Sequence, residues 1–486
     1  MDYSKLRVNT KVKNDSLELD EPVSPTTEYF LSEVVTLYVL GFMELEIPVD
    51  FSTIFAFIKD VFAKAHPRFS SIVIEDRNGK KMWKKVEVNV EDHIKVPNFP
   101  EDLSAESYKD HYDDYISSIS TSQLPQHKPL WEIHIINNPK HIDAKGVFLF
   151  KVHHAIGDGT SLMGVFLSCV KRVDDPTLPC TFPAKSTSST LQRKMSNTKQ
   201  IVMNMFNIFP RFIAPIIYSL YDFGQGVGSI FIEDDLTPIR SGNVDTSLPG
   251  SSRVCSMTFS LHDVKRIKTL LGVTINDIIV GMIFLGTQLY IREKDPGQLK
   301  EKQSTASIFV NVRSMKGNFS AEEMRQGKTF GNRITNIEVP FPNLEDDDLI
   351  KPLQFIKKAH NIIKRKRNGA LGLYLMASLL EVIRTIGGLK AAARTLERRW
   401  KNCSFAITNM IGPTDQVSFG NHPINGFYFV PTGINMSLVV SVLTYMDNIR
   451  LGFVVENGFI DPQKFMPCVE KAFQLIFEAT TATSKL

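Results

Sequence analysis

Hydrophobic and polar positions along the chain repeat with two periods, one typical of strands and one typical of helices. A nearly unbroken apolar run from Val147 to Val152 predicts a strand that is buried on both faces. Residues 131–135 alternate between apolar and polar and predict a second strand, whereas residues 52–65 and 101–119 follow the helical period. This mixture predicts an α/β protein with a central strand near residue 150.

The second half of the chain repeats this mixture of apolar runs and helical segments. Strands are predicted at residues 253–259, 304–312, 333–339, 403–410, 435–445 and 449–456. Helices are predicted at residues 262–271, 275–293, 350–367, 371–386 and 463–480. The last two strands meet around Met446 to Asn448, which predicts a hairpin. In the first half, Val86, Val88 and Val90 alternate with polar residues and predict a further strand.

Changes in composition along the chain divide it into two α/β units. Residues 1–22 are polar and charged, and we expect them to be disordered. Residues 23–185 form the first unit, residues 186–250 form a linker, and residues 251–486 form the second unit. A length of 486 residues is in keeping with two domains.

The linker contains a hydrophobic segment at residues 201–221 whose length suits a membrane span. Arg211 lies at its middle, where a charge costs about 2.5–3.5 kcal/mol on insertion. Pro210 and Pro215 interrupt any helix. The segment is therefore predicted to be a pair of helices at a membrane surface or between domains, without crossing the membrane.

Composition narrows the class of protein. Hydrophobic residues make up 43% and charged residues 22% of the chain, as in globular proteins. The net charge of +4 is too small to indicate a nucleic-acid partner. The 5 cysteines share no motif and are odd in number, which predicts reduced thiols in a protein that faces the cytosol.

Two histidines, His153 and His154, follow the central strand. The next residues include Gly157, Asp158 and Gly159, where we expect a sharp turn with backbone angles that glycine tolerates. Histidine is the usual general base near neutral pH. Asp158 is predicted to brace the turn, by pairing with an arginine or by capping amides.

We expect Thr160 and Ser161 to cap the helix that follows.

Other roles for the two histidines have less support. A histidine at a strand end is most often a satisfied core residue, and zinc needs at least three protein ligands. The chain has no Cys-x-x-Cys, His-Glu-x-x-His or Gly-x-Ser-x-Gly motif. A base that acts directly on a substrate hydroxyl needs no protein nucleophile, and this fits the residues present.

The heptapeptide His-His-Ala-Ile-Gly-Asp-Gly at residues 153–159 resembles the His-His-x-x-x-Asp-Gly signature of acyl-CoA-dependent acyltransferases. The chain most resembles the plant bifunctional wax ester synthase/diacylglycerol acyltransferases. Five further blocks carry this resemblance in order: Pro129–Trp131, Asn276–Asp277, Asn311–Arg313, Phe330–Asn332 and Thr408–Pro413. The resemblance covers nearly the whole chain.

The resemblance implies two chloramphenicol-acetyltransferase-like domains packed around an inter-domain tunnel. It also implies an O-acyltransferase that moves a fatty acyl group from acyl-CoA to a long-chain alcohol or to diacylglycerol. The 33 phenylalanines and 16 methionines suit either a core or a pocket for acyl chains. Acyl-CoA is a substrate, so neither a cofactor nor a metal is expected.

The same resemblance implies roles for individual residues. His154 is the expected general base, and His153 and Asp158 belong to the same catalytic motif. Gly159, Asn276 and Asp277 are expected at the substrate site, with Asn276 as a candidate donor to the oxyanion. Helix capping is the alternative for Asn276 and Asp277.

Two alternative functions remain at this point. Residues 222–226, Asp-Phe-Gly-Gln-Gly, resemble a block of the plant BAHD acyltransferases of soluble metabolites. That block lies near the C-terminal end in BAHD enzymes and contains tryptophan, so we interpret this match as coincidence. A lipid-binding protein without catalysis is the other alternative, and the intact motif around His154 argues against it.

Signals for location disagree. The resemblance implies the cytosolic face of the endoplasmic reticulum membrane, where the hydrophobic substrates lie. The alternative is the peroxisome, because Ser484–Leu486 matches a peroxisomal address. Two basic stretches, Lys364–Arg367 and Arg394–Lys401, are either solvated helix faces or contacts for the phosphates of CoA or lipid head groups.

Overall fold

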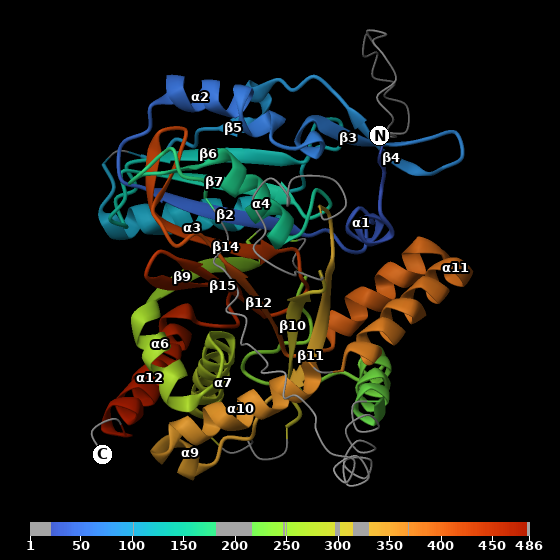
Figure 1. The fold of residues 1–486 in the computed structure, drawn as a ribbon, viewed down its shortest axis with the longest axis vertical. Coiled ribbons are helices and arrows are strands. Elements are labelled where there is room, and N and C mark those ends of the chain that lie inside the picture. Colours follow the sequence, from blue (N-terminus) through green and yellow to red (C-terminus); the bar gives the residue numbers. More distant parts are fainter. Residues whose placement is uncertain are drawn as a thin grey trace, which may run out of the picture.

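Two large β-sheets lie one above the other in the computed structural model, and helices cover their outer faces (Figure 1). The chain is therefore an α/β protein, as predicted. The structure describes residues 21–100, 102–180, 216–245, 248, 250–296, 302–313, 330–367 and 369–483. Three predictions fall wholly or mostly outside this part of the chain: the disorder of residues 1–22, the hydrophobic segment up to residue 215, and the role of Ser484–Leu486.

The upper sheet in Figure 1 has seven strands, most of them from the first half of the chain. Their order is β5 (Ile94–Lys95), β6 (Trp131–Asn137), β7 (Gly146–His153), β2 (Tyr38–Leu45), β14 (His422–Thr432), β13 (Val417–Phe419) and β8 (Lys171–Arg172). All pairings are antiparallel except that of β5 with β6. All 8 residues of β7 are buried, which confirms the prediction of a strand covered on both faces.

The lower sheet has six strands from the second half of the chain. Their order is β11 (Ile334–Pro340), β10 (Thr305–Asn311), β12 (Phe405–Ile411), β15 (Leu438–Tyr445), β16 (Asn448–Glu456) and β9 (Ser252–Ser260). Each predicted strand of this half is present, and Tyr445 pairs with Asn448 in the predicted hairpin. A small third sheet contains β1 (Glu21–Pro22), β4 (Lys81–Lys85) and β3 (Ser71–Glu75).

Helices pack on both sheets. The named α-helices are α1 (Pro25–Phe30), α2 (Phe51–Asp60), α3 (Ala105–Thr121), α4 (Gly159–Cys169), α6 (Leu261–Leu271), α7 (Ile275–Lys294), α9 (Asp346–Ile350), α10 (Pro352–Arg367), α11 (Ala370–Lys401) and α12 (Pro462–Thr483). Short 3₁₀ turns lie at Phe62–Lys64, Pro67–Ser70 and Val90–His93. Residues 216–228 are also helical.

Three hydrophobic cores separate the layers, and β2 contributes to two of them. Met43 and Leu45 pack on the side of the upper sheet that α2 and α4 cover. Leu40 and Phe42 belong to the core between the two sheets, which also includes side chains of α3 and α11. Successive side chains of a strand point to opposite faces, so one strand serves both cores. The third core lies between the lower sheet and α7.

The chain crosses between the sheets near its end. It leaves the lower sheet after β12, adds β13 and β14 to the upper sheet, and returns to the lower sheet as β15. β14 pairs with β2 along its length, from Ile424 opposite Leu45 to Thr432 opposite Tyr38. A strand from the second half of the sequence therefore completes the sheet of the first half.

Two local predictions of secondary structure were wrong in the first half. β4 ends at Lys85, and Val86, Val88 and Val90 form no strand. Their side chains are more buried than those of Glu87 and Asn89. The alternation of apolar and polar residues therefore follows their burial, although the segment does not pair with a neighbouring strand. The helix predicted over residues 52–65 ends at Asp60 and gives way to a 3₁₀ turn.

α11 is longer than the helix predicted at residues 371–386, and it folds back on itself. Gly388 has φ of +79°, which breaks the helix. Met376 on the first arm and Arg399 on the second both lie against Gly226, so the two arms lie side by side (Figure 1). Among the described residues, one helix, Leu371–Lys401, is long and apolar enough to cross a membrane, and this bend divides it into two shorter arms.

Candidate active site

The two histidines lie where β7 ends and the loop before α4 begins. His153 is the last residue of β7, and α4 begins at Gly159. Asp158 caps α4, because its side chain accepts a hydrogen bond of 3.0 Å from the amide of Ser161. The prediction that Thr160 and Ser161 form the cap was therefore wrong by two residues: both lie inside the first turn of the helix.

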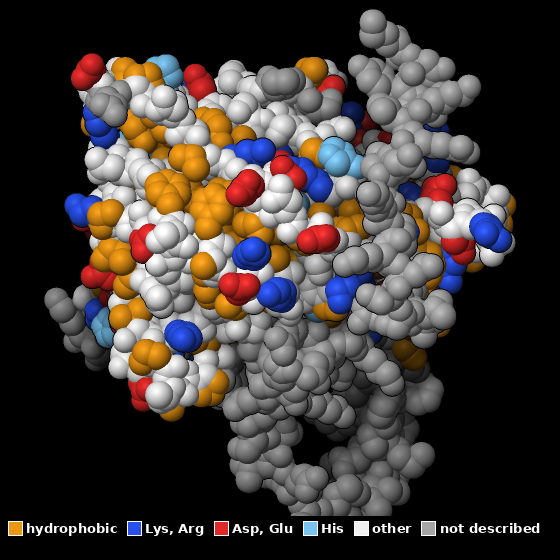
Figure 2. Space-filling model, turned by 90° about the horizontal axis from the view of Figure 1, so that it is seen from above, with side chains coloured by type: hydrophobic (Ala, Val, Ile, Leu, Met, Phe, Trp, Pro, Cys, Tyr) orange, Lys and Arg blue, Asp and Glu red, His pale blue; other side chains and the backbone are white. Residues whose placement is uncertain are grey.

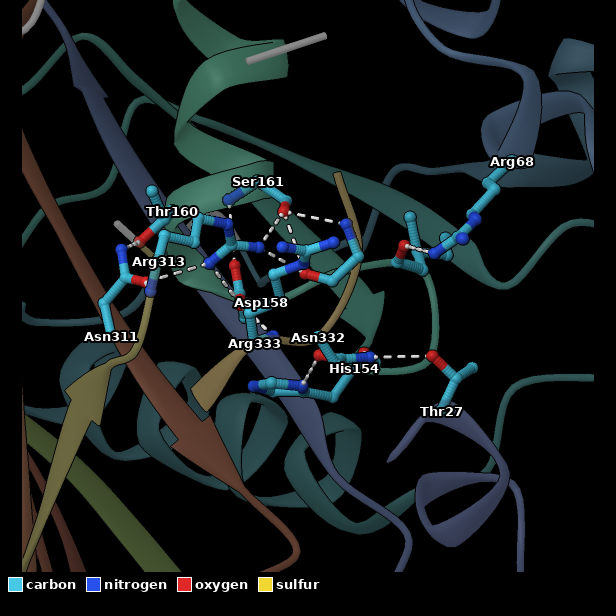
Figure 3. Close-up of polar contacts among 12 residues, drawn as sticks. Thr27, Arg68, His154, Asp158, Thr160, Ser161, Asn311, Arg313, Asn332 and Arg333 are labelled. Carbon is cyan, nitrogen blue, oxygen red and sulfur yellow. Dashed lines mark hydrogen bonds and ion pairs between the residues drawn. The ribbon is translucent and has the colours of Figure 1, made fainter. Parts of the chain in front are cut away.

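His154 is held in one tautomer by Asn332, which reaches it from the second half of the chain (Figure 3). The amide nitrogen of Asn332 donates to the carbonyl of His154 at 2.9 Å and to the hydroxyl of Thr27 at 3.2 Å. A carbonyl can only accept, so the other end of the Asn332 amide is the oxygen. That oxygen lies 2.9 Å from Nδ1 of His154 and must accept its proton. Nε2 is therefore left with its lone pair.

His154 is also kept neutral. The residue is 8% exposed, and burial lowers the pKa of its imidazole below the ordinary value of 6.5. The charge of Asp158 and the hydrogen bond to Asn332 oppose this effect and raise the pKa. Phe30 packs against the ring, with 4.7 Å between centroids. A neutral imidazole with a free Nε2 is the form that a general base requires.

His153 has a different environment. Its Nδ1 accepts a hydrogen bond of 3.1 Å from the amide of Ala155, and its ring lies edge-on to Tyr38. Burial lowers the pKa of His153 to about 3, so this imidazole stays uncharged over the physiological range. These contacts shape the loop, and His153 does not line the pocket beside His154.

Asp158 is buried at the centre of a charged network (Figure 3). Its Oδ2 accepts hydrogen bonds from Arg313 at 2.7 Å and from the amide of Arg333 at 2.8 Å. Arg313 also donates to the hydroxyl of Ser161 and to the carbonyl of Gly331. An arginine partner and a capped amide are the contacts predicted for a residue that braces the turn, and the structure confirms both.

The glycines of the loop are needed for space. Neither Gly157 nor Gly159 has a positive φ, so the expectation of unusual backbone angles was wrong. A Cβ on Gly157 would lie 3.0 Å from Cβ of Ser161, and one on Gly159 would lie 3.2 Å from Sδ of Met410. The glycine that does require a positive φ is Gly331, at +115°, directly before Asn332.

A pocket of about 80 Å³ lies beside His154, where the upper and lower sheets meet. The first half of the chain contributes wall residues from β2, the histidine loop and the start of α4. The second half contributes residues of β10, β11, β12 and β14. Asn311, Thr408 and Asn409 are among its polar residues, and Gly159 is also part of its wall. The pocket thus joins both halves at the candidate base, whereas a continuous tunnel stays a prediction.

Asn276 and Asp277 lie at the start of α7 and do not line this pocket. Asp277 forms a capping box with Thr274 and accepts a hydrogen bond of 2.8 Å from His360. Asn276 accepts a hydrogen bond of 2.7 Å from Asn409, which does line the pocket. These contacts show capping for Asp277 and place Asn276 one residue behind the pocket wall. A substrate role for either stays a prediction.

Two residues of the site were given no role from the sequence. Asn332 orients His154, and Arg313 pairs with Asp158. Both belong to sequence blocks that were noticed, residues 330–332 and 311–313, but nothing in their local pattern shows what they contact. The signal was the order of short polar blocks far apart in sequence, of which residues 311–313 lie at the end of β10 and residues 330–332 precede β11.

Profiles of known families match most of the chain. The wax ester synthase/diacylglycerol acyltransferase catalytic domain matches residues 56–279, and the WS/DGAT C-terminal domain matches residues 330–477. The chain belongs to the wax ester synthase/diacylglycerol acyltransferase (WS/DGAT) family. As a member of this family it is an acyl-CoA-dependent acyltransferase. The family match argues against the BAHD alternative. Asp222, in the BAHD-like block, forms an ion pair of 2.8 Å with Lys366.

Individual proteins agree with this WS/DGAT assignment. Wax ester synthase/diacylglycerol acyltransferase 4 of Arabidopsis thaliana is 28% identical, and the match covers 98% of this chain and 93% of that protein. A wax ester synthase/diacylglycerol acyltransferase from Marinobacter aquaeolei has a similar fold, with a TM-score of 0.61 and 15% identity over 95% of this chain and all of that one. The first condensation domain of the CDA synthetase gives a TM-score of 0.55 at 13% identity over 95% of this chain and 96% of that one. The predicted two-domain acyltransferase fold is confirmed.

Proposed function

We propose that this WS/DGAT protein transfers a fatty acyl group from acyl-CoA to the hydroxyl of a long-chain alcohol or of diacylglycerol, with His154 as the general base. One observation carries the role of His154: Asn332 fixes the proton on Nδ1, and no described residue forms a hydrogen bond with Nε2. Family membership supports the class of reaction and of substrates.

The proposed reaction is a direct transfer. Nε2 of His154 takes the proton of the alcohol as its oxygen attacks the thioester carbonyl of acyl-CoA. The tetrahedral intermediate then collapses, the carbon–sulfur bond breaks, and the proton passes from His154 to the sulfur of CoA. Apart from acyl-CoA itself, which is consumed, the scheme uses no cofactor and no metal ion.

The negative charge of the tetrahedral intermediate needs hydrogen-bond donors that are already in place. Asn409 lines the pocket and uses one amide hydrogen to donate to Asn276. We therefore assign Asn276 an indirect role, in which it orients the amide of Asn409 toward the pocket. Thr160 also lines the pocket, and its hydroxyl oxygen accepts from Asn311, so its proton is free to donate to the oxyanion.

The decisive experiment supplies purified protein with radiolabelled palmitoyl-CoA and either hexadecanol or diacylglycerol. The proposal expects a labelled wax ester, triacylglycerol or both from the wild type, and neither from His154→Ala. A parallel assay supplies soluble phenolic and amine acceptors, and transfer to these alone would support a BAHD-like activity instead. Binding of the lipids without any turnover would show a lipid-binding protein.

The substrates of this reaction dissolve in membranes, and one face of the structure fits a membrane surface. Exposed hydrophobic side chains lie on the first arm of the α11 hairpin, on the neighbouring helix at residues 216–228 and just after that helix. They are Ile216, Ile217, Tyr218, Leu220 and Tyr221 on that helix, Phe231 and Ile232 after it, and Leu371, Tyr374, Val382 and Ile386 on α11. Exposed Lys390 and Arg394 follow the bend. On the side seen in Figure 2, by contrast, small groups of hydrophobic side chains are separated by charged and polar ones.

We therefore place this face on an anionic lipid surface, without a membrane crossing. Ile386, at the bend of α11, is 84% exposed, and burying such a side chain in lipid gains about 1.5–3 kcal/mol. Ile386→Asp should weaken binding to phosphatidylcholine/phosphatidylserine vesicles about tenfold or more in a flotation assay. Ile350→Asp is the matched control, since Ile350 is 75% exposed on α9. Equal binding by both variants would contradict this placement.

The proposed location is the cytosolic face of the endoplasmic reticulum, the site of diacylglycerol and of hydrophobic alcohols. A fluorescent protein fused to the N-terminus should colocalise with a reticulum marker. Protease should reach tags at residues 190 and 245 from the cytosolic side. Peroxisomal fluorescence that disperses when residues 484–486 are deleted would refute this location.

A further inference from the structure

A buried arginine, Arg68, contacts the histidine loop from the first half of the chain. It lies in the 3₁₀ turn at Pro67–Ser70, and its side chain is 5% exposed. Nη1 of its guanidinium donates a hydrogen bond of 3.0 Å to the carbonyl of Ile156, two residues after His154. Nη2 donates a hydrogen bond of 2.7 Å to a carboxylate oxygen of Glu21. Arg68 therefore holds the backbone of the loop close to the candidate base.

The same guanidinium lies against the segment that leads to Asn332. Its Cζ atom is 5.3 Å from the centroid of the Phe330 ring. A Cβ on Gly331 would lie 3.4 Å from Nη1 of Arg68, so the backbone of this glycine is close to the guanidinium. The ring of His66 stacks on Phe330, with 3.5 Å between the centroids. Arg68 therefore contacts both the histidine loop and the segment that carries Asn332.

The orientation of the imidazole depends on how these two segments lie against each other. Asn332 forms hydrogen bonds with His154 at two points, its carbonyl and its Nδ1. A shift of one segment against the other would disturb both hydrogen bonds, and misplacement of a reacting group by about 1 Å can lower a rate about a hundredfold. The precision of the base therefore depends on the contacts that hold the two segments together.

Arg68 and Arg313 hold different parts of the site. Arg313 pairs with Asp158 and donates to the carbonyl of Gly331. Arg68 donates to a loop carbonyl nearer to His154, and Figure 3 shows the two arginines on opposite sides of Asp158. Because their partners differ, the placement of the base can be changed without breaking the ion pair of Asp158.

Arginine suits the position of Arg68 better than lysine does. A guanidinium is flat, stacks on aromatic rings and donates hydrogen bonds in fixed directions, whereas the ammonium of lysine is a compact charge on a flexible stem. The Cζ atom of Arg68 lies 5.3 Å from the ring centroids of both Trp83 and Phe330. The ion pair with Glu21, whose side chain is 53% exposed, fixes which edge of the guanidinium faces the loop.

We propose that Arg68 is a positioning residue for the general base: it fixes the histidine loop against residues 330–332, so that Asn332 can orient the imidazole of His154. Arg68 is not part of the pocket wall and acts without contact with the substrate. The inference rests on the proposed function, because a base needs a fixed direction to take a proton from a bound substrate. Glu21 supports this role by orienting the guanidinium.

The first experiment is a double-mutant cycle on kcat and KM of acyl transfer. Arg68→Lys should lower kcat about tenfold with KM within about twofold of wild type, because contacts with the substrate are unchanged. In the Asn332→Ala background, Arg68→Lys should lower kcat by less than about twofold, since the imidazole has already lost its orienting partner. A tenfold loss in both backgrounds would overturn the proposal, as would a rise in KM without a fall in kcat.

Arg240→Lys is the matched control. The side chain of Arg240 is 3% exposed, and it donates to the carbonyl of Asp234 at 2.7 Å and to the carboxylate of Glu233 at 2.8 Å. It thus has the same kinds of partner as Arg68, and neither of these partners lines the His154 pocket. Both lysine variants should lower the Tm by a similar amount, and only Arg68→Lys should lower kcat. Equal losses of kcat in the two variants would overturn the proposal.

A milder variant keeps the test open if Arg68→Lys does not fold. Glu21→Gln replaces the charged acceptor of the guanidinium by a neutral one, which weakens the hydrogen bond. It should lower kcat about threefold, with KM unchanged, and this loss should disappear in the Asn332→Ala background. Unchanged kcat in every folded variant of Arg68 and Glu21 would overturn the proposal.

A spectroscopic measurement separates failure of this proposal from failure of the proposed function. In protein that contains isotope-labelled histidine, the NMR signals that His154→Ala removes report the tautomer of His154. The proposal expects one tautomer, with the proton on Nδ1, in the wild type and in Arg240→Lys, and a mixture of tautomers in Arg68→Lys. If the wild type shows no acyl transfer but this difference is present, Arg68 positions the imidazole and the proposed reaction is wrong. A single tautomer in all three proteins would contradict the role of Arg68.

Discussion

Each half of the chain places a polar dipeptide near the start of a helix, and the two dipeptides differ in whether a side-chain atom stays available to a substrate. His153 and His154 precede α4, and within the part of the chain that the structure describes no residue forms a hydrogen bond with Nε2 of His154, which lies beside the pocket. Asn276 and Asp277 open α7 behind the pocket wall, and Asp277 is engaged with Thr274 and His360. Only the first dipeptide presents an unused proton acceptor to a substrate.

The two buried aspartates, Asp158 and Asp277, also differ in what they hold in place. Asp158 and Asp277 are both 0% exposed, and both use a carboxylate oxygen to cap a helix. Asp158 additionally pairs with Arg313, and so fixes the loop that carries His154. A charged residue in a motif can therefore be essential to the shape of a site without contact with the substrate. The following predictions test this separation of base, orienting residue and braces.

The largest effect is expected for His154→Ala. Loss of a general base lowers the rate about 100- to 10,000-fold, and the variant should fold because the change removes no charged pair. The measurement is kcat/KM for acyl transfer, together with the Tm. His153→Ala is the matched control and should retain much more activity. Turnover by His154→Ala within a few-fold of wild type would exclude His154 as the base.

Asp158→Ala should mainly lower stability. It leaves Arg313, whose side chain is 4% exposed, without its carboxylate partner, and such a change costs about 3–5 kcal/mol. Denaturant unfolding measures the loss, and the rate should fall as the loop loosens. Asp174→Ala removes an ion pair whose aspartate is 61% exposed and should change stability by less than about 1 kcal/mol. Equal stability of the two variants would contradict the bracing role.

Asn332→Ala should lower kcat by about 10- to 100-fold, because the imidazole loses its fixed orientation. A pH profile tests the effect of the Asn332 hydrogen bond on the pKa of His154. In the wild type, kcat/KM should fall with decreasing pH only below about 6.5, since burial lowers the pKa of His154. The hydrogen bond to Asn332 raises this pKa, so its removal should move the acid limb to still lower pH. An unchanged limb would show that the hydrogen bond to Asn332 does not raise this pKa.

The smallest effect on chemistry is expected for Asp277→Ala. Loss of the capping box should cost about 0.5–2 kcal/mol of stability. Once the variant is folded, kcat and KM should stay within a few-fold of wild type. A large rise in KM with unchanged stability would instead show that Asp277 contacts substrate, and the contrast with the His154 loop would fail.

These contrasts also show which parts of the protein the sequence predicts. Local periodicity predicts the strand that ends at His153 and the strands and helices of the second half. Each of these elements has a buried side, and this gives its apolar residues a regular spacing in the sequence. The second arm of α11 was not predicted, because Gly388 interrupts the helical pattern of the sequence. The residues after it, Leu389 to Trp400, form a helix that packs against the core between the two sheets. Asn332 and Arg313, the side-chain partners of His154 and Asp158, lie more than 150 positions away from them, and only the folded chain brings them together.

The crossing of β13 and β14 into the upper sheet has a consequence for biosynthesis. While the ribosome is still making the second half, β2 has β7 as a neighbour on one edge, but its other edge waits for residues 422–432. An unpaired edge is a template for pairing with other chains. Domains often fold in turn as they emerge, but here the upper sheet cannot be completed until residues 422–432 have left the ribosome. Folding of the first half therefore depends on translation of the second. Residues 23–185 expressed alone should aggregate, because one edge of β2 stays unpaired.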